Sequence, residues 1–278
     1  MTTDDLNGDR PHTATGEILI GTSGWSYRHW RGTFYPERLV GNGTLAYYVA
    51  RFATVEINRT FYSLPQATTI ERWRETARPG FTFAAKAPRV ITHMKRLRRS
   101  DAALADFLTD VRGLGPALGP ILFQLPGGFP RDTGLLRNFL DMLPRDLTYA
   151  FEFRDESWFR DRIYDMLADR EAAFCIYHLG DRETPHVVTA PFVYLRLHGL
   201  GTSHAGAYGR EELQRWADAC QQWAADEFDV RVYFNNDIGG SALRDAVTLR
   251  NLVGERVAWG LPRDRKSGAD SSNGRLFG

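Results

Sequence analysis

The sequence contains little cysteine and no long apolar run. Its two cysteines, Cys175 and Cys220, lie in apolar segments without metal-type spacing, which excludes a disulfide framework and favours a reducing compartment. No apolar run reaches the length of a membrane span, and the start "MTTDDLNGDR" lacks the basic and apolar parts of a signal peptide. We therefore expect a cytoplasmic protein without a membrane partner.

An excess of charge of one sign is also absent. Lysine and arginine number 35 against 34 aspartate and glutamate, for a formal net charge of +1. This excludes a surface that holds nucleic acid by overall charge, but not a local basic patch. Internal repeats and linkers rich in proline, glycine or serine are missing from the body of the chain. We predict one domain over residues 16–260, with disordered segments at 1–15 and 261–278.

Short apolar runs of strand type alternate with helical patterns along the body of the chain. Only 13 residues separate the sixth run from the seventh, so the helix between them should be reduced to a turn. This order predicts an α/β fold, a TIM-barrel-like (β/α)8 barrel with a degenerate sixth helix. A doubly wound sheet is disfavoured because no glycine-rich fingerprint follows the first run. The eight predicted strands are 18–22, 54–58, 81–86, 121–125, 149–153, 173–178, 192–198 and 231–236.

Polar side chains interrupt these strands near their C-terminal ends. In "YLRLHG", Leu195 and Leu197 alternate with Arg196 and His198, and the apolar pair must face the outer helices. Active sites of TIM barrels lie at the C-terminal ends of the strands, so inward polar groups there are the strongest indication of function. On the other strands the same alternation turns inward Glu56, Asn58, Lys86, Gln124, Glu152, Arg154, Asn235 and Asp237.

These inward charges have a structural as well as a functional interpretation. Ion pairs such as Glu56 with Arg196 could stiffen the top of the barrel without any chemistry. Barrels usually fill such positions with Val, Ile and Leu, however, because burying charge is costly. We therefore favour acid and base chemistry on a substrate of anionic or many-hydroxyl character. The predicted catalytic residues are Glu56, Lys86, Glu152, Arg154, Arg196, His198 and Asp237.

Two of these residues receive distinct roles. Glu152 is the candidate general base or metal ligand, and Arg196 would hold an anionic group or stabilise developing charge. Both lie near the open end of the barrel, so we expect them to be partly hydrated and needed for function more than for folding. Polar and aromatic residues around the same mouth are predicted to bind substrate, namely Trp25, Asn58, Tyr62, His93, Gln124, Asn235 and Asn236.

Seven segments, in order, resemble one known family. They are "GTSGWSYRHWRGTFYP", "VEINRTFYSLP", "FAAKAPRVITH", "ILFQLP", "FEFRDESW", "YLRLHG" and "YFNND". Together they are similar to the YecE-like proteins, known as domain of unknown function 72, over residues 18 to 253. The resemblance implies a TIM-barrel-like fold, which agrees with the strand count, and brings no established activity with it.

The loops at the mouth suggest anion binding. Lys95, Arg96, Arg98 and Arg99 precede Ser100, a good N-cap for the next helix, and a basic loop at a helix start would attract an anion. A solvated basic loop is the other interpretation. Glycines and a helix-opening serine follow the last two strands in "GLGTSHAGAYG" and "NNDIGGSA", the loops that often bind phosphate in this fold.

Three classes of function follow from these features. The first is a hydrolase or lyase that acts on a phosphate-containing or nucleic-acid substrate at the barrel mouth. The second is a glycoside-processing enzyme that uses Glu56 and Glu152. The third is a noncatalytic module that binds small anions or nucleic acid. A divalent metal, Mg²⁺, Mn²⁺ or Zn²⁺, could be held by Glu56, Glu152, Asp237 and His198. The oligomeric state stays open.

Overall fold

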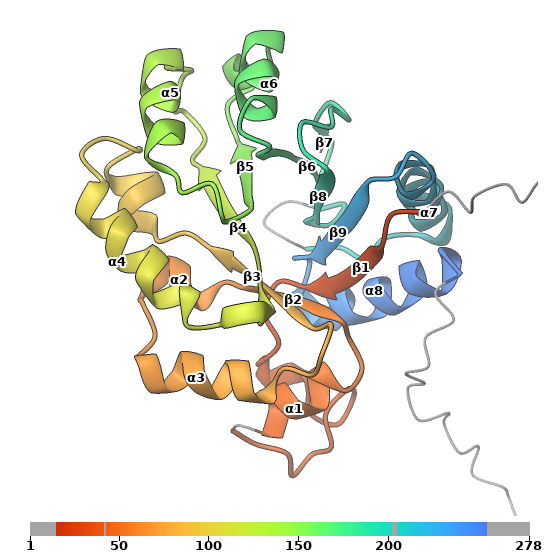
Figure 1. Cartoon of the computed structure of the whole chain (residues 1–278). Coiled ribbons are helices and arrows are strands. Elements are labelled where there is room, and N and C mark those ends of the chain that lie inside the picture. Colours follow the sequence, from red (N-terminus) through yellow and green to blue (C-terminus); the bar gives the residue numbers. More distant parts are fainter. Residues whose placement is uncertain (1–14, 42, 202–204, 255–278) are drawn as a thin grey trace, which may run out of the picture.

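Eight parallel strands form a nearly closed barrel in the computed structural model, which describes residues 15–41, 43–201 and 205–254 (Figure 1). Neighbouring strands pair in the order β1-β9-β8-β6-β5-β4-β3-β2. The two end strands meet where Gly24 N donates to Glu56 O at 2.8 Å. This confirms the predicted α/β barrel. The strands are β1 (Ile18–Thr22), β2 (Thr54–Ile57), β3 (Thr82–Lys86), β4 (Leu118–Leu125), β5 (Tyr149–Phe153), β6 (Ala173–Leu179), β8 (Phe192–Leu197) and β9 (Asp229–Phe234).

Helices surround the strands on the outside (Figure 1). They are α1 (Gly43–Val49), α2 (Arg59–Tyr62), α3 (Ala67–Thr76), α4 (Asp101–Arg112), α5 (Thr133–Met142), α6 (Asp161–Ala168), α7 (Arg210–Ala225) and α8 (Ser241–Leu252). Short helical turns are η1 (Arg28–Trp30), η2 (Val90–Met94), η3 (Gly115–Ala117), η4 (Glu156–Trp158) and η5 (Ile238–Gly240). No helix occurs in the fully described stretch 180–191, where only the two-residue β7 (Arg182–Glu183) pairs with β6. The helix expected between β6 and β8 is therefore missing from this stretch, which confirms the predicted degenerate sixth helix.

Side chains of the strands divide between two apolar cores, as the alternation predicts. On β8, Val193, Leu195 and Leu197 pack in the outer core with the helices, while Tyr194 packs in the inner core. The inner core is small because a barrel of eight strands has room for little more than its own side chains. Its members are Ala84, Leu122, Ala150, Ala173, Cys175, Ala190, Phe192, Tyr194 and Tyr233.

One glycine lets the barrel approach closure. A Cβ atom at Gly21 of β1 would lie 2.1 Å from the carbonyl oxygen of Thr54 on β2, closer than any real contact. Glycine is therefore required where the two end strands approach each other. The closure brings the residues that follow β1 next to those at the end of β2.

The termini give no test of the predicted disorder. Apart from residue 15, the segments 1–15 and 261–278 lie outside the described residues. Among the described residues, no helix combines the length and the apolar character needed to cross a bilayer.

Candidate functional site

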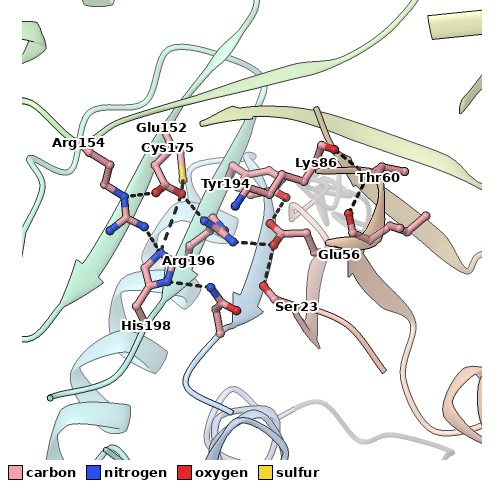
Figure 2. A network of polar contacts seen from close by, with 12 residues as sticks. Ser23, Glu56, Thr60, Lys86, Glu152, Arg154, Cys175, Tyr194, Arg196 and His198 are labelled. Atoms are coloured by element: carbon pink, nitrogen blue, oxygen red, sulfur yellow. Dashed lines mark hydrogen bonds and ion pairs between the residues drawn. The ribbon is translucent and has the colours of Figure 1, made fainter. Parts of the chain in front are cut away.

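Three buried charged residues meet at the C-terminal ends of β2, β5 and β8. Arg196 Nη1 donates to Glu152 Oε2 at 2.5 Å, and Nη2 donates to Glu56 Oε1 at 2.7 Å. Figure 2 shows the guanidinium between the two carboxylates. All three side chains are 0% exposed, so the expectation that Glu152 and Arg196 are partly hydrated is wrong. We call Glu56, Arg196 and Glu152 the ion network.

The remaining oxygen atoms of the ion network are also occupied. Ser23 Oγ donates to Glu56 Oε1 and Tyr194 OH donates to Oε2, both at 2.7 Å. Arg154 Nε donates to Glu152 Oε1, and Cys175 Sγ lies 3.8 Å from Oε2. Buried carboxylates are tolerated where each oxygen has a partner, and here each has at least one.

Glu152 stays ionised far below neutral pH. Burial alone raises the pKa of its carboxyl group, but the nearby cations of Arg154, Arg196 and Lys86 outweigh burial and lower the pKa to about 2. A general base at neutral pH needs a higher pKa and a free oxygen atom. The geometry therefore favours a positioning role for Glu152, which holds the guanidinium groups of Arg154 and Arg196 in place.

Arg154 is fixed on three sides. Besides its bond to Glu152, its Nη2 lies 2.8 Å from His198 Nε2, and its guanidinium stacks 4.4 Å from the ring centroid of Tyr177. A guanidinium can only donate, so His198 Nε2 is the acceptor in this contact. Asn235 Nδ2 lies 3.1 Å from the other ring nitrogen. The Arg154 side chain is 12% exposed, and this part faces the mouth.

A cavity of about 440 Å³ lies above these residues, and we call it the mouth cavity. Of the described residues that line it, three are cations and none is a carboxylate, because Glu56 and Glu152 lie beneath the floor. Three amides and three aromatic rings complete the wall. The lining residues are Tyr27, Asn58, Phe61, Tyr62, Lys86, Gln124, Arg154, Arg196 and Asn235.

Lys86, at the end of β3, is the least constrained cation of the cavity. Its Nζ lies 4.3 Å from the centroid of the Phe61 ring. Burial and the charge of Arg196 lower the pKa of the amine to about 8, against partial opposition from Glu152 and Glu56. Within the described part of the chain, no residue hydrogen-bonds Nζ or forms an ion pair with it. Lys86 thus combines a reduced pKa with an open approach.

His93, which belongs to η2, lies beside Lys86. Its ring packs edge-on against Phe61, with 4.9 Å between ring centroids, and Thr92 Oγ1 lies 2.9 Å from Nδ1. Burial and the positive charge of Lys86 lower the pKa of His93 to about 4. His93 is therefore a neutral group at the edge of the mouth cavity.

Three predicted site residues lie elsewhere. Asn236 donates to Asp245 Oδ2 at 2.7 Å and to Gly206 O. Asp237 accepts from Trp30 Nε1 at 2.8 Å, and its Oδ2 lies 2.8 Å from His29 Nε2. β9 ends at Phe234, so the alternation that turned Asp237 inward no longer applies.

Trp25 lines a neighbouring cavity and packs edge-on against Trp73. The other eleven predicted residues surround the mouth cavity or its floor.

Some residues of the site were not predicted. Ser23 binds Glu56, and Cys175 and Tyr177 on β6 contact Glu152 and Arg154. Alternation along the sixth strand would have turned Cys175 and Tyr177 inward, so the same pattern could have found them. Ser23 has no such signal, because its contact with Glu56 depends on how β1 and β2 meet.

Comparison with known proteins places this chain in a family. A family model described as "Protein of unknown function DUF72" matches residues 19–267. The chain belongs to this family. The predicted resemblance to YecE-like proteins is thereby confirmed.

Two curated relatives and two solved structures illustrate the family. UPF0759 protein YecE of Escherichia coli is 38% identical over 143 residues, 51% of this chain and 50% of YecE, so the match spans about half of that relative. UPF0759 protein YunF of Bacillus subtilis is 24% identical over 88% of this chain and 98% of YunF.

Crystal structures of DUF72 proteins share the fold. The protein from Thermotoga maritima gives a TM-score of 0.77 at 25% identity, over 86% of this chain and 99% of that one. The protein from Enterococcus faecalis gives 0.74 at 19% identity, over 85% and 95% of the two chains. These likenesses establish the α/β barrel and assign no activity.

The predicted metal ligands of this DUF72 barrel do not gather. Glu56 and Glu152 are separated by Arg196, and Asp237 binds Trp30 instead. Among the described residues, the one group of metal-ligating atoms within 4.8 Å of one another is His178, Glu183 and Glu212. Both of its carboxylates are paired with Arg215 at 2.6 Å, so a cation already occupies them.

The basic loop of this DUF72 chain is held by its own contacts. Lys95 Nζ donates to Arg99 O at 2.9 Å, and Arg98 pairs with Asp132 at 3.1 Å. Ser100 occupies the N-cap of α4, as predicted, but its hydroxyl donates to Leu97 O and makes no cap bond. No residue of this loop lines the mouth cavity.

The glycine-rich loops after β8 and β9 are described only in part. Residues 202–204 of the first lie outside the described residues. In the second, Gly239 and Gly240 have φ angles of 77° and 73°, left-handed conformations that favour glycine. These two glycines therefore serve the turn into α8.

Proposed function

We propose that this protein is an enzyme, a hydrolase or lyase, that acts on a small phosphate-containing substrate in the mouth cavity. The observation that carries the proposal is the lining, which combines Lys86, Arg154 and Arg196 with no carboxylate among its described residues. The two carboxylates beneath the floor, Glu56 and Glu152, are balanced by Arg196 and Arg154 together. An anion entering the cavity would therefore meet guanidinium and ammonium donors and a net charge of one, that of protonated Lys86.

The cations contribute in different ways. Arg154 is partly exposed and held by Glu152 and His198, so it would bind phosphate oxygens without losing much conformational freedom. Arg196 is buried and would act through its charge from below. Lys86 is the group whose proton can move, because its pKa of about 8 lies near physiological pH.

The alternative functions fit the geometry less well. A glycoside-processing enzyme needs a sugar between two carboxylates, but here a guanidinium fills the space between Glu56 and Glu152. A nucleic-acid substrate would need basic surface beyond the cavity, and the basic loop of residues 95–99 does not line it. A noncatalytic anion-binding module uses the same cations, so experiment must separate it from an enzyme.

A thermal-shift screen tests the proposal. The panel contains inorganic phosphate, sugar phosphates, nucleotides, a single-stranded oligonucleotide and neutral oligosaccharides. A ligand at about 100 times its Kd stabilises the fold by about 2.7 kcal/mol. We expect small phosphorylated compounds to raise the melting temperature of the wild type and of Arg112→Met, which changes an exposed arginine far from the mouth, but not of Arg154→Met.

Two further outcomes decide the class of function. Stabilisation by neutral sugars or by the oligonucleotide alone would overturn the proposal. With a stabilising phosphorylated compound in hand, its conversion is followed by nuclear magnetic resonance. Conversion that is lost in Lys86→Met supports an enzyme, whereas binding without any conversion by the wild type supports the binding module.

A further inference from the structure

We infer that the amine of Lys86 forms an imine with a carbonyl group of the substrate, so that the substrate is an aldehyde or ketone that also carries a phosphate or carboxylate. This inference rests on the proposed function, because the same cations hold the anionic group. It goes beyond that function in naming the covalent step and the reacting atom.

The choice of lysine at this position supports the inference. Of the 35 lysine and arginine residues, only three are lysines, Lys86, Lys95 and Lys266. The chain otherwise uses arginine, including at the two other cationic positions of the mouth cavity. Arginine keeps its proton in proteins, whereas an amine can lose its proton and become a nucleophile. The one cavity position with a lysine is thus the one where covalent chemistry is available.

The surroundings of Nζ favour the neutral amine. Glu152 and Glu56 are the carboxylates whose charge acts on the amine, but their oxygen atoms are occupied by Arg196, Arg154, Ser23 and Tyr194. On another side the amine faces the ring of Phe61, which supplies no proton acceptor of the carboxylate kind. With a pKa of about 8, Lys86 has a neutral fraction on the order of a hundredfold larger at pH 7 than an ordinary lysine.

The step balances without any oxidant or reductant. The lone pair of Nζ attacks the carbonyl carbon, and a C–N bond forms as the carbonyl π bond breaks. The resulting carbinolamine keeps one hydrogen on nitrogen, its hydroxyl takes up one proton from solvent and leaves as water, and a protonated C=N bond remains. The protonated imine withdraws electrons from the adjacent carbon more strongly than the carbonyl did. Bond cleavage next to that carbon is lyase chemistry, which narrows the proposed reaction.

Two amide side chains line the cavity in which the carbinolamine would form. Gln124 and Asn58 line the same cavity as Lys86. Asn58 Oδ1 is buried and has no hydrogen-bond partner among the described residues. An unpaired buried oxygen is costly, and a hydroxyl or ammonium hydrogen of a bound intermediate would satisfy it.

Borohydride trapping tests the inference. The full-length protein is incubated with pyruvate, with dihydroxyacetone phosphate or with neutral acetone, then reduced with sodium borohydride and measured by intact-mass spectrometry. We expect a single adduct with the two anionic carbonyl compounds, mapped by peptide sequencing to Lys86. Lys95→Met, which removes an exposed lysine, should keep the adduct, and Lys86→Met should lose it.

The outcomes separate the imine from the proposed function. No adduct from compounds that still stabilise the protein in the thermal-shift screen would overturn the imine alone. An adduct at Lys86 that forms equally with neutral acetone would support the imine and overturn the anionic substrate. Adducts spread over Lys95 and Lys266 as well would show general amine chemistry and overturn the inference.

Discussion

The ion network and Lys86 lie in the same end of the barrel but differ in how their charge is balanced. Glu56, Arg196 and Glu152 are fully buried, and every carboxylate oxygen has a donor. The amine of Lys86, by contrast, packs 4.3 Å from the centroid of the Phe61 ring, and Lys86 lines the cavity. Matched charge holds a structure in place, whereas unmatched charge is left for a ligand.

The comparison teaches how a barrel can keep charge at its mouth. The carboxylates neutralise Arg196 from within and lower the cost of burying it. Glu152 also fixes Arg154 toward the cavity without itself lining the cavity. Glu56 and Glu152 thus balance Arg154 and Arg196, and Lys86 supplies the net positive charge of the cavity, which is an arrangement suited to holding an anion in a defined position.

Breaking the ion network should have the largest effect. Arg196→Met leaves two buried carboxylates without their shared cation, and we expect the free energy of unfolding to fall by about 3–5 kcal/mol. Urea denaturation at pH 7 measures the loss. Arg112→Met removes the exposed partner of Asp146 and should leave the midpoint within experimental scatter.

A second variant shows whether the loss comes from uncompensated charge. The triple change Glu56→Gln, Glu152→Gln and Arg196→Met removes all three charges together, so it should recover part of the stability lost in Arg196→Met alone. If Arg196→Met is as stable as the wild type, the ion network does not hold the mouth together, and the contrast with Lys86 disappears.

The next effect is the acid dependence of Glu152. Its folded pKa of about 2 lies below the ordinary value of 4.5, so its contribution to stability is present above about pH 4.5 and is lost as pH falls toward 2. A shift of this size corresponds to about 3 kcal/mol. Glu152→Gln should therefore be less stable than the wild type at pH 7, with a difference that narrows on acidification.

Urea unfolding at pH 7, 5, 4 and 3 measures this difference for both proteins. Glu71→Gln, at an exposed residue that pairs with Arg74, is the matched control and should track the wild type at every pH. A constant difference between Glu152→Gln and the wild type across this range would mean that Glu152 stabilises the fold by packing and not by charge.

The sequence alone predicts the fold and most of the site, because both depend on periodicity. Strand alternation correctly turned Glu56, Glu152 and Arg196 into one barrel end. It failed for Asp237, which follows the end of β9 and no longer obeys a period of two. Hydration could not be read from the pattern either, because it depends on which donors close around Glu152 in three dimensions.

The mouth cavity shows the same limit. Spacing predicts that Lys86 and Arg154 face inward. It does not predict that Arg154 pairs with Glu152 while the amine of Lys86 packs on the ring of Phe61. The contact of Ser23 with Glu56 likewise depends on how closely β1 approaches β2 at Gly21.

The smallest predicted effect is a gain in the free energy of unfolding, whereas the two effects above are losses. It tests the contrast between Lys86 and the ion network most directly. A lysine whose folded pKa of about 8 lies below its ordinary 10.5 destabilises the folded state while it is protonated. This penalty is fully present below about pH 8 and disappears as pH rises toward 10.5. Lys86→Met should therefore raise the free energy of unfolding at pH 7, by about 1 kcal/mol after the loss of the contact with Phe61 is subtracted.

Melting curves of the wild type and Lys86→Met at pH 7 and pH 10 measure this gain, with Lys95→Met as the exposed-lysine control. We expect the gain at pH 7 to shrink at pH 10, because the wild-type amine is then largely neutral, and Lys95→Met to show no gain at either pH. A lower melting temperature for Lys86→Met at pH 7 would mean that the amine is a structural partner of the ion network. Lys86 and the ion network would then be parts of one matched cluster, and the cavity would have no cation left over for an anion.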